Sequence, residues 1–364
     1  MTQFIPIAKP INGAEERAAF DGVLESGMLI QGKHVASFEA EFADQLGGGR
    51  TCVAVNSGTS ALHLGLLAAG IGPGDEVIVP SFTFAATANS VALTGATPVF
   101  ADIDPDTYCL DPEAVEAEIT EKTRGVMPVH LFGHPAAVDR LLVICATRGL
   151  LLFEDAAQAH GATFLGRAVG TFGAWGAFSF YPTKNMTCGE GGMVSCSSQE
   201  MAHLVRLLRN QGMERQYDNE VIGLNNRMTD IHASIGRVQL TKIEQWTKQR
   251  VANAAFLSDN LEAVTTPVVA PGATHVFNQY TIRVPEDRDR VQSVLRDEYG
   301  VGTGAYYPTP SHRLASLERF ARTPLPVTDQ AAKEVLSLPV HPSLTNQDLE
   351  RIVEAVNAVV RAGA

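Results

Sequence analysis

Short apolar runs alternate with amphipathic stretches through the first two-thirds of the chain. Apolar residues at helical spacing predict helices over 59–70, 84–95 and 138–149. Apolar runs bounded by glycine, proline or acidic residues predict strands over 76–80, 98–104, 125–133 and 150–157, with further short strands in AWGAFSFYP and GGMVSC. Strands that alternate with helices form βαβ units, so we expect an α/β fold with a mostly parallel central sheet.

The pattern changes after about residue 228. Residues 229–264 predict one long helical stretch, which is followed by a strand in FNQYTIRV and by helices near 287–299, 328–337 and 345–361. This mixture predicts a smaller C-terminal α+β domain. We therefore expect a large domain over residues 1–245 and a small domain over residues 246–364.

Three segments are expected to meet at one edge of the sheet. Ligands of open α/β sheets bind beyond the carboxyl ends of the strands, which brings together Ser57–Thr59, Asp155 and Ser179–Lys184. In VNSGTSAL (55–62), a turn of small residues exposes amides at a helix N-terminus, where an anion binds well. An ordinary N-cap by Ser57 or Thr59 explains the same residues.

Lys184 lies in an unusual neighbourhood, FSFYPTKNMTCGEGGM (178–193), among aromatic, hydroxyl and glycine residues. Burial lowers the pKa of a lysine and suits its neutral amine to Schiff-base chemistry. The ordinary alternative is a lysine whose ammonium group reaches solvent from a buried strand.

FEDAAQAHGA (153–162) places two acids at the end of an apolar strand. Asp155 is followed by Ala156 and Ala157, which leave room for a flat ligand, and a buried carboxylate needs a cation such as a protonated pyridine nitrogen. Gln158 is placed to hydrogen-bond a ring substituent. Glu154 is interpreted as a solvated loop carboxylate or a helix cap.

Composition and charge exclude several classes of protein. Hydrophobic residues make up 45% of the chain, so a sizeable core can form, and the net charge of −12 argues against binding to nucleic acid or to an anionic membrane. The five cysteines form no CxxC pair and are interpreted as reduced, mainly buried thiols of a cytoplasmic protein. No signal peptide, membrane span or metal site is expected, and His130, His134 and His160 are interpreted as packing residues.

The ordered set SGTSAL, PSFTFAATAN, EDAAQAHGA, FSFYPTKN, GEGG, GLNNRMTDIHASIG and YYPTPSH closely resembles the DegT/DnrJ/StrS family of sugar aminotransferases. The likeness runs from IPIAKP near the start to SLPVHP near the end. These enzymes depend on pyridoxal 5′-phosphate (PLP) and have fold type I. The resemblance therefore implies a PLP enzyme whose large domain is followed by a smaller C-terminal domain.

The resemblance also implies roles for individual residues. Lys184 matches the lysine that forms the Schiff base with PLP, and Asp155 matches the carboxylate that pairs with the pyridinium nitrogen. The other implied PLP contacts are Gly58, Thr59 and Ser179 at the phosphate, Phe84 stacked on the ring, Gln158 near the ring hydroxyl, and Asn225 from the neighbouring subunit. Tyr307 and His312 fall in a segment that lines the sugar pocket.

The implied reaction moves an amino group from L-glutamate to a 3- or 4-keto sugar carried on a nucleoside diphosphate, within a homodimer that shares its active sites. A keto-cyclitol aminotransferase of the scyllo-inosose type is an alternative. A PLP-dependent sugar dehydratase is a second, although those relatives usually carry histidine in place of Lys184. A non-catalytic sensor or regulator is a third, but no basic patch or helix-turn-helix extension is present. The motifs assign no arginine clamp for a second carboxylate.

Overall fold

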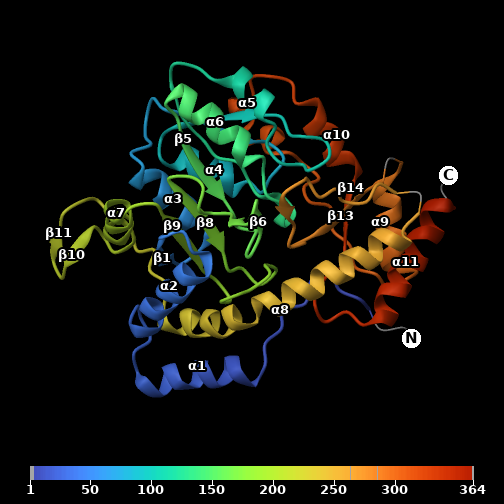
Figure 1. Ribbon diagram of the computed structural model, residues 1–364, viewed down its shortest axis with the longest axis horizontal. Helices are drawn as coiled ribbons and strands as arrows, with labels where there is room; N and C mark the ends of the chain where they lie inside the picture. The colour runs from blue at the N-terminus through green and yellow to red at the C-terminus, as the bar shows by residue number, and fades with distance from the viewer. Residues whose placement is uncertain (1–3, 263, 285, 363–364) are drawn as a thin grey trace.

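A seven-stranded sheet forms the centre of the molecule (Figure 1). The computed structural model describes residues 4–262, 264–284 and 286–362. The strand order is β1 (Thr51–Val55), β9 (Gly192–Cys196), β8 (Trp175–Ser179), β5 (Leu151–Asp155), β4 (Thr123–Val126), β2 (Glu76–Pro80) and β3 (Thr97–Ala101). All neighbouring pairs are parallel except those of β9, which runs antiparallel to β1 and β8. The predicted mostly parallel sheet is confirmed.

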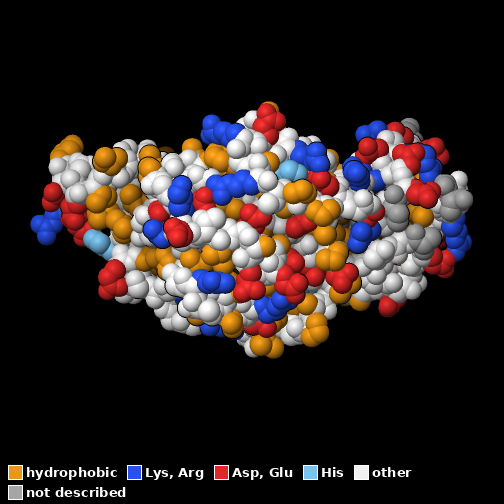
Figure 2. All heavy atoms as spheres, turned by 90° about the horizontal axis from the view of Figure 1, so that it is seen from above, with side chains coloured by type: hydrophobic (Ala, Val, Ile, Leu, Met, Phe, Trp, Pro, Cys, Tyr) orange, Lys and Arg blue, Asp and Glu red, His pale blue; other side chains and the backbone are white. Residues whose placement is uncertain are grey.

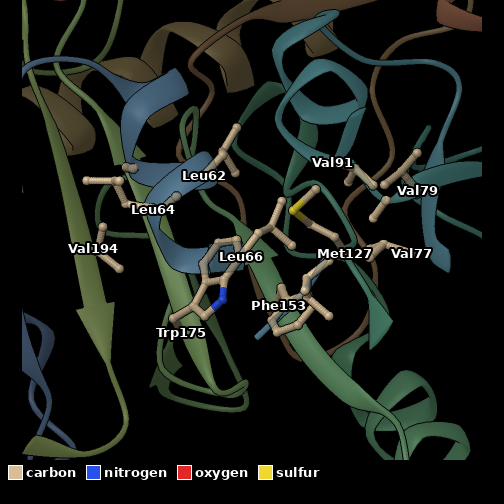
Figure 3. Packing of buried hydrophobic residues seen from close by; sticks show 14 of the residues in the cluster. Leu62, Leu64, Leu66, Val77, Val79, Val91, Met127, Phe153, Trp175 and Val194 are labelled. Carbon is tan, nitrogen blue, oxygen red and sulfur yellow. The ribbon is translucent and has the colours of Figure 1, made fainter. Parts of the chain in front are cut away.

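Apolar clusters cover both faces of this sheet. Alternate residues of a strand point to opposite faces, so Val53 and Val55 belong to one cluster while Cys52 and Ala54 belong to the other. The first face packs against α3 (Gly58–Ala68), α4 (Ala86–Leu93) and α7 (Gln199–Arg209). Figure 3 shows this cluster, in which the rings of Phe153 and Trp175 stack with their centroids 4.9 Å apart. The opposite face packs against α2 (Lys33–Leu46), α5 (Pro112–Glu118) and α6 (Val138–Arg148).

Helix α8 (Asp230–Asn260) connects the sheet to the C-terminal part of the chain (Figure 1). Its first half lies against α2 and α1 (Ala14–Ser26), and its second half buries Ala254 and Leu257 in a separate apolar cluster. This cluster is formed with the antiparallel pair β13 (Tyr280–Arg283) and β14 (Val335–Leu338), and with α9 (Arg288–Asp297) and α11 (Asn346–Arg361). Residue 245 therefore lies inside α8, and the division into domains at this residue stays a prediction.

The remaining elements are short. Strands β10 (Met213–Arg215) and β11 (Asp218–Asn219) form a hairpin that projects from the body of the molecule (Figure 1). Strands β12 (Ala273–Thr274), β6 (Thr163–Phe164) and β7 (Arg167–Ala168) form a small sheet. The others are α10 (Pro326–Glu334) and the 3₁₀ turns η1 (Leu131–Gly133), η2 (Ser311–Arg313) and η3 (Glu318–Phe320).

Most predicted elements are present, although several differ in their limits, and two of these differences have a clear physical reason. The strand predicted over 125–133 ends at Val126, and the chain then forms η1 at Leu131–Gly133. Pro128 lies at the point where the ladder stops, as expected for a residue that has no N–H to donate. The helix predicted over 328–337 ends at Glu334, because Val335–Leu338 pairs with β13 instead.

Candidate active site

The structure brings the three predicted segments together where β1, β5 and β8 end. Asp155 is the last residue of β5, and Ser179 is the last residue of β8. Gly58 begins α3, and a Cβ added there would come within 2.7 Å of the Ser179 Cβ, so only glycine allows this close approach. Lys184 follows β8 and interacts electrostatically with Asp155.

The N-terminus of α3 offers amides to an anion. Ser57 caps the helix, because its Oγ accepts a hydrogen bond from the Ser60 N–H at 3.1 Å. The first intrahelical bond runs from the Ala61 N–H to the Ser57 carbonyl at 3.0 Å, so the amides of Gly58 and Thr59 precede it. The cap and the anion site are thus compatible, and the helix dipole adds to the attraction.

Asp155 presents a buried carboxylate. The Thr87 hydroxyl donates to its Oδ2 at 2.8 Å, and the Ala157 N–H donates to its Oδ1 at 3.1 Å. Burial raises the pKa of Asp155, while these two hydrogen bonds and Lys184 oppose the rise. A cationic N–H facing this carboxylate would stabilise its charged form.

Lys184 carries an amine that is easily deprotonated. Burial lowers its pKa to about 8, and the attraction of Asp155 opposes that effect. At neutral pH roughly a tenth of such an amine is neutral, against less than a thousandth for an ordinary lysine. The side chain is therefore suited to attack a carbonyl and to take up a proton.

Phe84, Gln158 and Tyr307 lie near one another. The Phe84 side chain is 60% exposed, and its ring centroid lies 6.2 Å from that of Tyr307. Gln158 donates from Nε2 to the Tyr307 hydroxyl at 3.0 Å and accepts from the Phe132 N–H at 2.7 Å. The exposed face of Phe84 can cover a flat ring, while Gln158 and Tyr307 hold each other in place.

Asn225 and His312 are set apart from this group by their contacts. Asn225 is exposed, and its backbone pairs with Asn210 in an isolated antiparallel bridge. Within the described residues, no hydrogen bond involves the Asn225 side chain. His312 is buried, and its Nδ1 lies 2.7 Å from the Ser81 Oγ, which places its ring against the loop after β2.

The interpretation of Glu154 as a solvated carboxylate or helix cap was wrong. The side chain is fully buried and accepts hydrogen bonds from the amides of Gly170, Phe172 and Gly173 at 2.6–2.8 Å. Strand alternation could have revealed this, because Glu154 must face the opposite side of the sheet from Asp155. His130 is its fourth partner, with Nε2 3.1 Å from the Glu154 Oε2.

The cysteines and the surface add no second reaction centre among the described residues. All five cysteines are free and buried, and burial raises the pKa of Cys188 far above its ordinary value. The described ranges contain no group of three or more His, Cys, Asp or Glu side chains that could hold a metal ion. In those same ranges, no helix has the length and apolar character needed to cross a membrane.

These features together fit PLP. Its phosphate matches the amides at the start of α3, its ring nitrogen matches Asp155, and its carbonyl matches Lys184. The flat ring requires the small residues beside Asp155 and an aromatic cover such as Phe84.

Two relatives are similar over almost the whole chain. A dTDP-3-amino-3,4,6-trideoxy-alpha-D-glucose transaminase of Streptomyces venezuelae is 42% identical over 349 residues, which cover 94% of this chain and 91% of the relative. A protein of Geobacillus stearothermophilus named pleiotropic regulatory protein is 41% identical over 345 residues, which cover 92% of each chain.

Solved structures show the same fold. DesV of Streptomyces venezuelae, in complex with a ketimine intermediate, has a TM-score of 0.94 and 40% identity, and the match covers 99% of both chains. The PLP form of the sugar aminotransferase Spr1654 from Streptococcus pneumoniae has a TM-score of 0.94 and 26% identity, with 99% of this chain and 100% of that chain covered. The profile of the DegT/DnrJ/EryC1/StrS aminotransferase family matches residues 10–357. The chain therefore belongs to the DegT/DnrJ/EryC1/StrS aminotransferase family, which confirms the family predicted from the motifs.

Proposed function

We propose that this aminotransferase uses PLP to move an amino group from L-glutamate to the 3- or 4-keto carbon of a sugar on a nucleoside diphosphate. The observation that carries the proposal is the placement of Lys184 with the buried carboxylate of Asp155 and the N-terminus of α3 at one edge of the sheet, where burial also lowers the pKa of Lys184 to about 8. The names of the Streptomyces venezuelae transaminase and of a GDP-perosamine synthase of Caulobacter vibrioides, 39% identical over 367 residues, support a nucleotide-linked sugar as the substrate.

Different residues of the chain have different roles in the proposed reaction. When bound, PLP supplies the carbonyl that takes the amino group and the aromatic ring that accepts an electron pair. The neutral amine of Lys184 would be the group that holds the cofactor through this carbonyl, and the same Nζ would take the proton from the donor's α-carbon. Asp155 would keep a proton on the ring nitrogen, and the amides of Gly58 and Thr59, with Ser179, would hold the phosphate.

The sugar side of the site is assigned to the segment around Tyr307 and His312. Tyr307 is fixed by Gln158 at 3.0 Å and lies beside the exposed ring of Phe84, so the sugar would enter next to the cofactor ring. Asn278 adds a buried Oδ1 that has no partner within the described chain. Aromatic and amide groups of this kind suit a hydroxylated substrate.

A homodimer with shared active sites is part of the proposal. The β10–β11 hairpin projects from the body of the molecule (Figure 1). The hairpin and the segment after it expose Tyr217, Ile222 and Leu224, and a group of exposed apolar side chains can mark an association surface. Asn225 follows directly and is free to reach the phosphate site of a second copy. A twofold dimer places this segment of each subunit at the site of the other.

The alternatives are less well supported. The presence of Lys184 opposes a dehydratase, which would need no transfer of nitrogen. One relative carries a regulatory name, but the set of Lys184, Asp155 and the α3 N-terminus supports catalysis in this chain. Figure 2 shows acidic and basic side chains interspersed over one face without a broad basic area, which gives a DNA-binding regulator no support.

A single-turnover experiment tests the proposal. We expect glutamate to convert the PLP form to the pyridoxamine form with release of 2-oxoglutarate, and a nucleotide-linked 3- or 4-keto sugar to reverse this spectral change. Reversal only by keto-inositols would select the cyclitol alternative. Reversal only by simple keto acids would reject both the keto-sugar and the keto-cyclitol as substrates. Loss of a sugar hydroxyl without gain of nitrogen would identify a dehydratase.

A further inference from the structure

A small cavity lies directly beside Lys184. Its volume is about 20 Å³, which holds a group the size of a water molecule or a carboxylate but not a sugar ring. Its lining includes Lys184, Asn185, Lys9, Gln239, Trp246 and Arg250. The cavity thus brings the N-terminal segment, the loop after β8 and the middle of α8 to one point.

Arg250 is a buried cation without an anionic partner. Its side chain is 7% exposed, and its Nη1 donates to the Phe277 carbonyl at 3.2 Å. Its Nε is buried and has no hydrogen-bond partner, and no ion pair within the described residues includes it. Burial lowers the pKa of Arg250 to about 10, and no nearby acid opposes the shift. A guanidinium in this state is stabilised when an anion binds.

The other charges around the cavity have the same sign. Lys9 and Lys184 line it, and none of its lining residues is acidic. His341 lies close by but stays neutral, because burial, Arg250 and Lys9 lower its pKa to about 4. Glu16 contacts Gln239 at 2.9 Å but is already paired with Lys242 at 2.8 Å. Asp155 offsets part of the charge of Lys184, but Arg250 and Lys9 have no carboxylate among the lining residues, so this side of the cavity is positive.

We propose that Arg250, assisted by Lys9, binds a carboxylate of the amino-acid donor while its amino group faces the Lys184 side of the cofactor. This inference rests on the proposed aminotransferase function and names the group that selects the donor. The donor's carboxylate would supply the negative charge that Arg250 lacks within the described residues. The keto sugar carries its charge on the diphosphate, and a cavity of about 20 Å³ does not admit a nucleoside diphosphate, so we assign Arg250 to the donor half-reaction.

Binding of glutarate to the PLP form of the enzyme provides the direct test, because this dicarboxylate has no amino group to react. We expect saturable binding by calorimetry, and the affinity for glutarate should fall at least tenfold in Arg250→Gln and two- to fivefold in Lys9→Gln. The Lys9 side chain is exposed, so its replacement should leave the fold intact. Uncharged glutaramide should not bind. Arg288→Gln is the matched control, because Arg288 is also buried and donates to a backbone carbonyl, that of Val335 at 2.8 Å, but lies outside this cavity.

Kinetics of the two half-reactions separate a donor site from a structural role. Arg250→Gln should raise the KM for the amino donor at least tenfold and leave the keto-sugar half-reaction within twofold of the unchanged enzyme. Equal loss in both half-reactions, matched by Arg288→Gln, would overturn the proposal. Binding of a nucleoside diphosphate that depends on Arg250, with unchanged glutarate affinity, would overturn it as well.

The same assays distinguish failure of this inference from failure of the proposed function. If the unchanged enzyme accepts another amino acid but not glutamate, the glutamate proposal fails, while an equal effect of Arg250→Gln on that donor supports the carboxylate site. If glutamate is the donor and Arg250→Lys and Arg250→Gln both keep its KM, the carboxylate site fails and the proposed function stands.

Discussion

The Nδ1 of His312 lies 2.7 Å from the Oγ of Ser81, in the loop between β2 and α4 that carries Phe84. Ser81 also accepts the backbone N–H of His312 at 3.0 Å, and the His312 Nε2 lies 3.4 Å from Asp329. Serine, histidine and aspartate stand in the order of a hydrolytic triad, but Ser81 is fully buried and cannot reach a substrate. This chain of contacts instead connects the 306–312 segment to the loop that carries Phe84.

Replacement of His312 by alanine should therefore affect both stability and the sugar subsite. It removes two side-chain contacts and leaves the Ser81 hydroxyl buried with fewer partners, so we expect a loss of about 1–3 kcal/mol in the free energy of unfolding. The KM for the keto sugar should rise, because the backbone around Tyr307 is less well fixed. Urea denaturation and steady-state kinetics measure the two effects. Ser81→Ala should cause a smaller loss of stability and a smaller rise in KM. If His312→Ala changes the KM for the keto sugar without changing stability, His312 contacts the sugar directly instead.

Lys184 should destabilise the cofactor-free protein in a pH-dependent way. Its pKa falls from 10.5 to about 8 on folding, so between these values the unfolded chain holds a proton that the folded chain has released, and stability rises with pH. Below pH 8 both states are protonated and the full cost of burying the charge is present. Lys184→Met should therefore be more stable than the unchanged protein at pH 7, by up to about 3 kcal/mol, and this advantage should shrink from pH 8 to 10.5.

Chemical denaturation of both cofactor-free proteins across that pH range gives the comparison. Lys248→Met is the control, because Lys248 is exposed and forms only a surface pair with Glu244. A pH-independent difference between Lys184→Met and the unchanged protein would show that this lysine is not the group with the lowered pKa. Borohydride reduction of the PLP form, followed by peptide mapping, should separately place the cofactor on Lys184.

Asp155→Asn keeps the shape of the side chain but removes the charge that stabilises a protonated ring nitrogen. We expect the half-reaction with the amino donor to slow by about two orders of magnitude or more. Stopped-flow absorbance of the cofactor measures this rate. Asp111→Asn is a suitable control, because asparagine can still cap α5 in place of Asp111 and the site is elsewhere. Rates near those of the unchanged enzyme in Asp155→Asn would exclude the proposed role.

Asn225→Ala tests the shared active site. The side chain is exposed and contributes no hydrogen bond within the described chain, so its loss should leave the thermal stability of the cofactor-free protein unchanged. If it reaches the phosphate site of a second subunit, the affinity for PLP should fall about tenfold, as for one lost contact to an anion. Sedimentation should show a dimer for both proteins, and full activity of a monomer would contradict the proposal.

Local patterns predicted the sheet well, since its strands are short segments, while the residues assigned to the cofactor stay a prediction. The strand at 76–80 has the predicted limits because an apolar run is bounded by GPGD and a proline. Val335–Leu338 was missed because its apolar residues suit a helix as well as a strand, and only pairing with β13 decides between them. Arg250 was missed because an arginine in a long amphipathic helix is indistinguishable from a surface residue until the N-terminal segment and Phe277 cover it.

Glu154 provides the last test, because it fixes the loop that follows β7 and precedes β8. Its two oxygens accept from three amides at 2.6–2.8 Å and from the His130 Nε2 at 3.1 Å. The Ala136 N–H donates to the His130 Nδ1 at 3.0 Å, so the histidine proton is on Nε2 and all four groups donate to the carboxylate. Burial raises the pKa of Glu154, but these donors outweigh that effect and the pKa is lowered overall.

Glu154→Gln replaces one acceptor oxygen by an NH₂ group that must face N–H donors. We expect a loss of about 3 kcal/mol in the free energy of unfolding at neutral pH. Glu244→Gln, on the surface of α8, is the control and should leave the free energy of unfolding nearly unchanged. Because the folded-state pKa is lowered, the stabilisation by Glu154 is present above the unfolded pKa and is lost as the pH falls through the folded pKa, so the two proteins should converge in acid. Denaturation curves from neutral to acidic pH measure this convergence. A cost below about 1 kcal/mol at neutral pH would mean that the glycine-rich loop keeps its position, and with it the adjacent Asp155, without the buried charge.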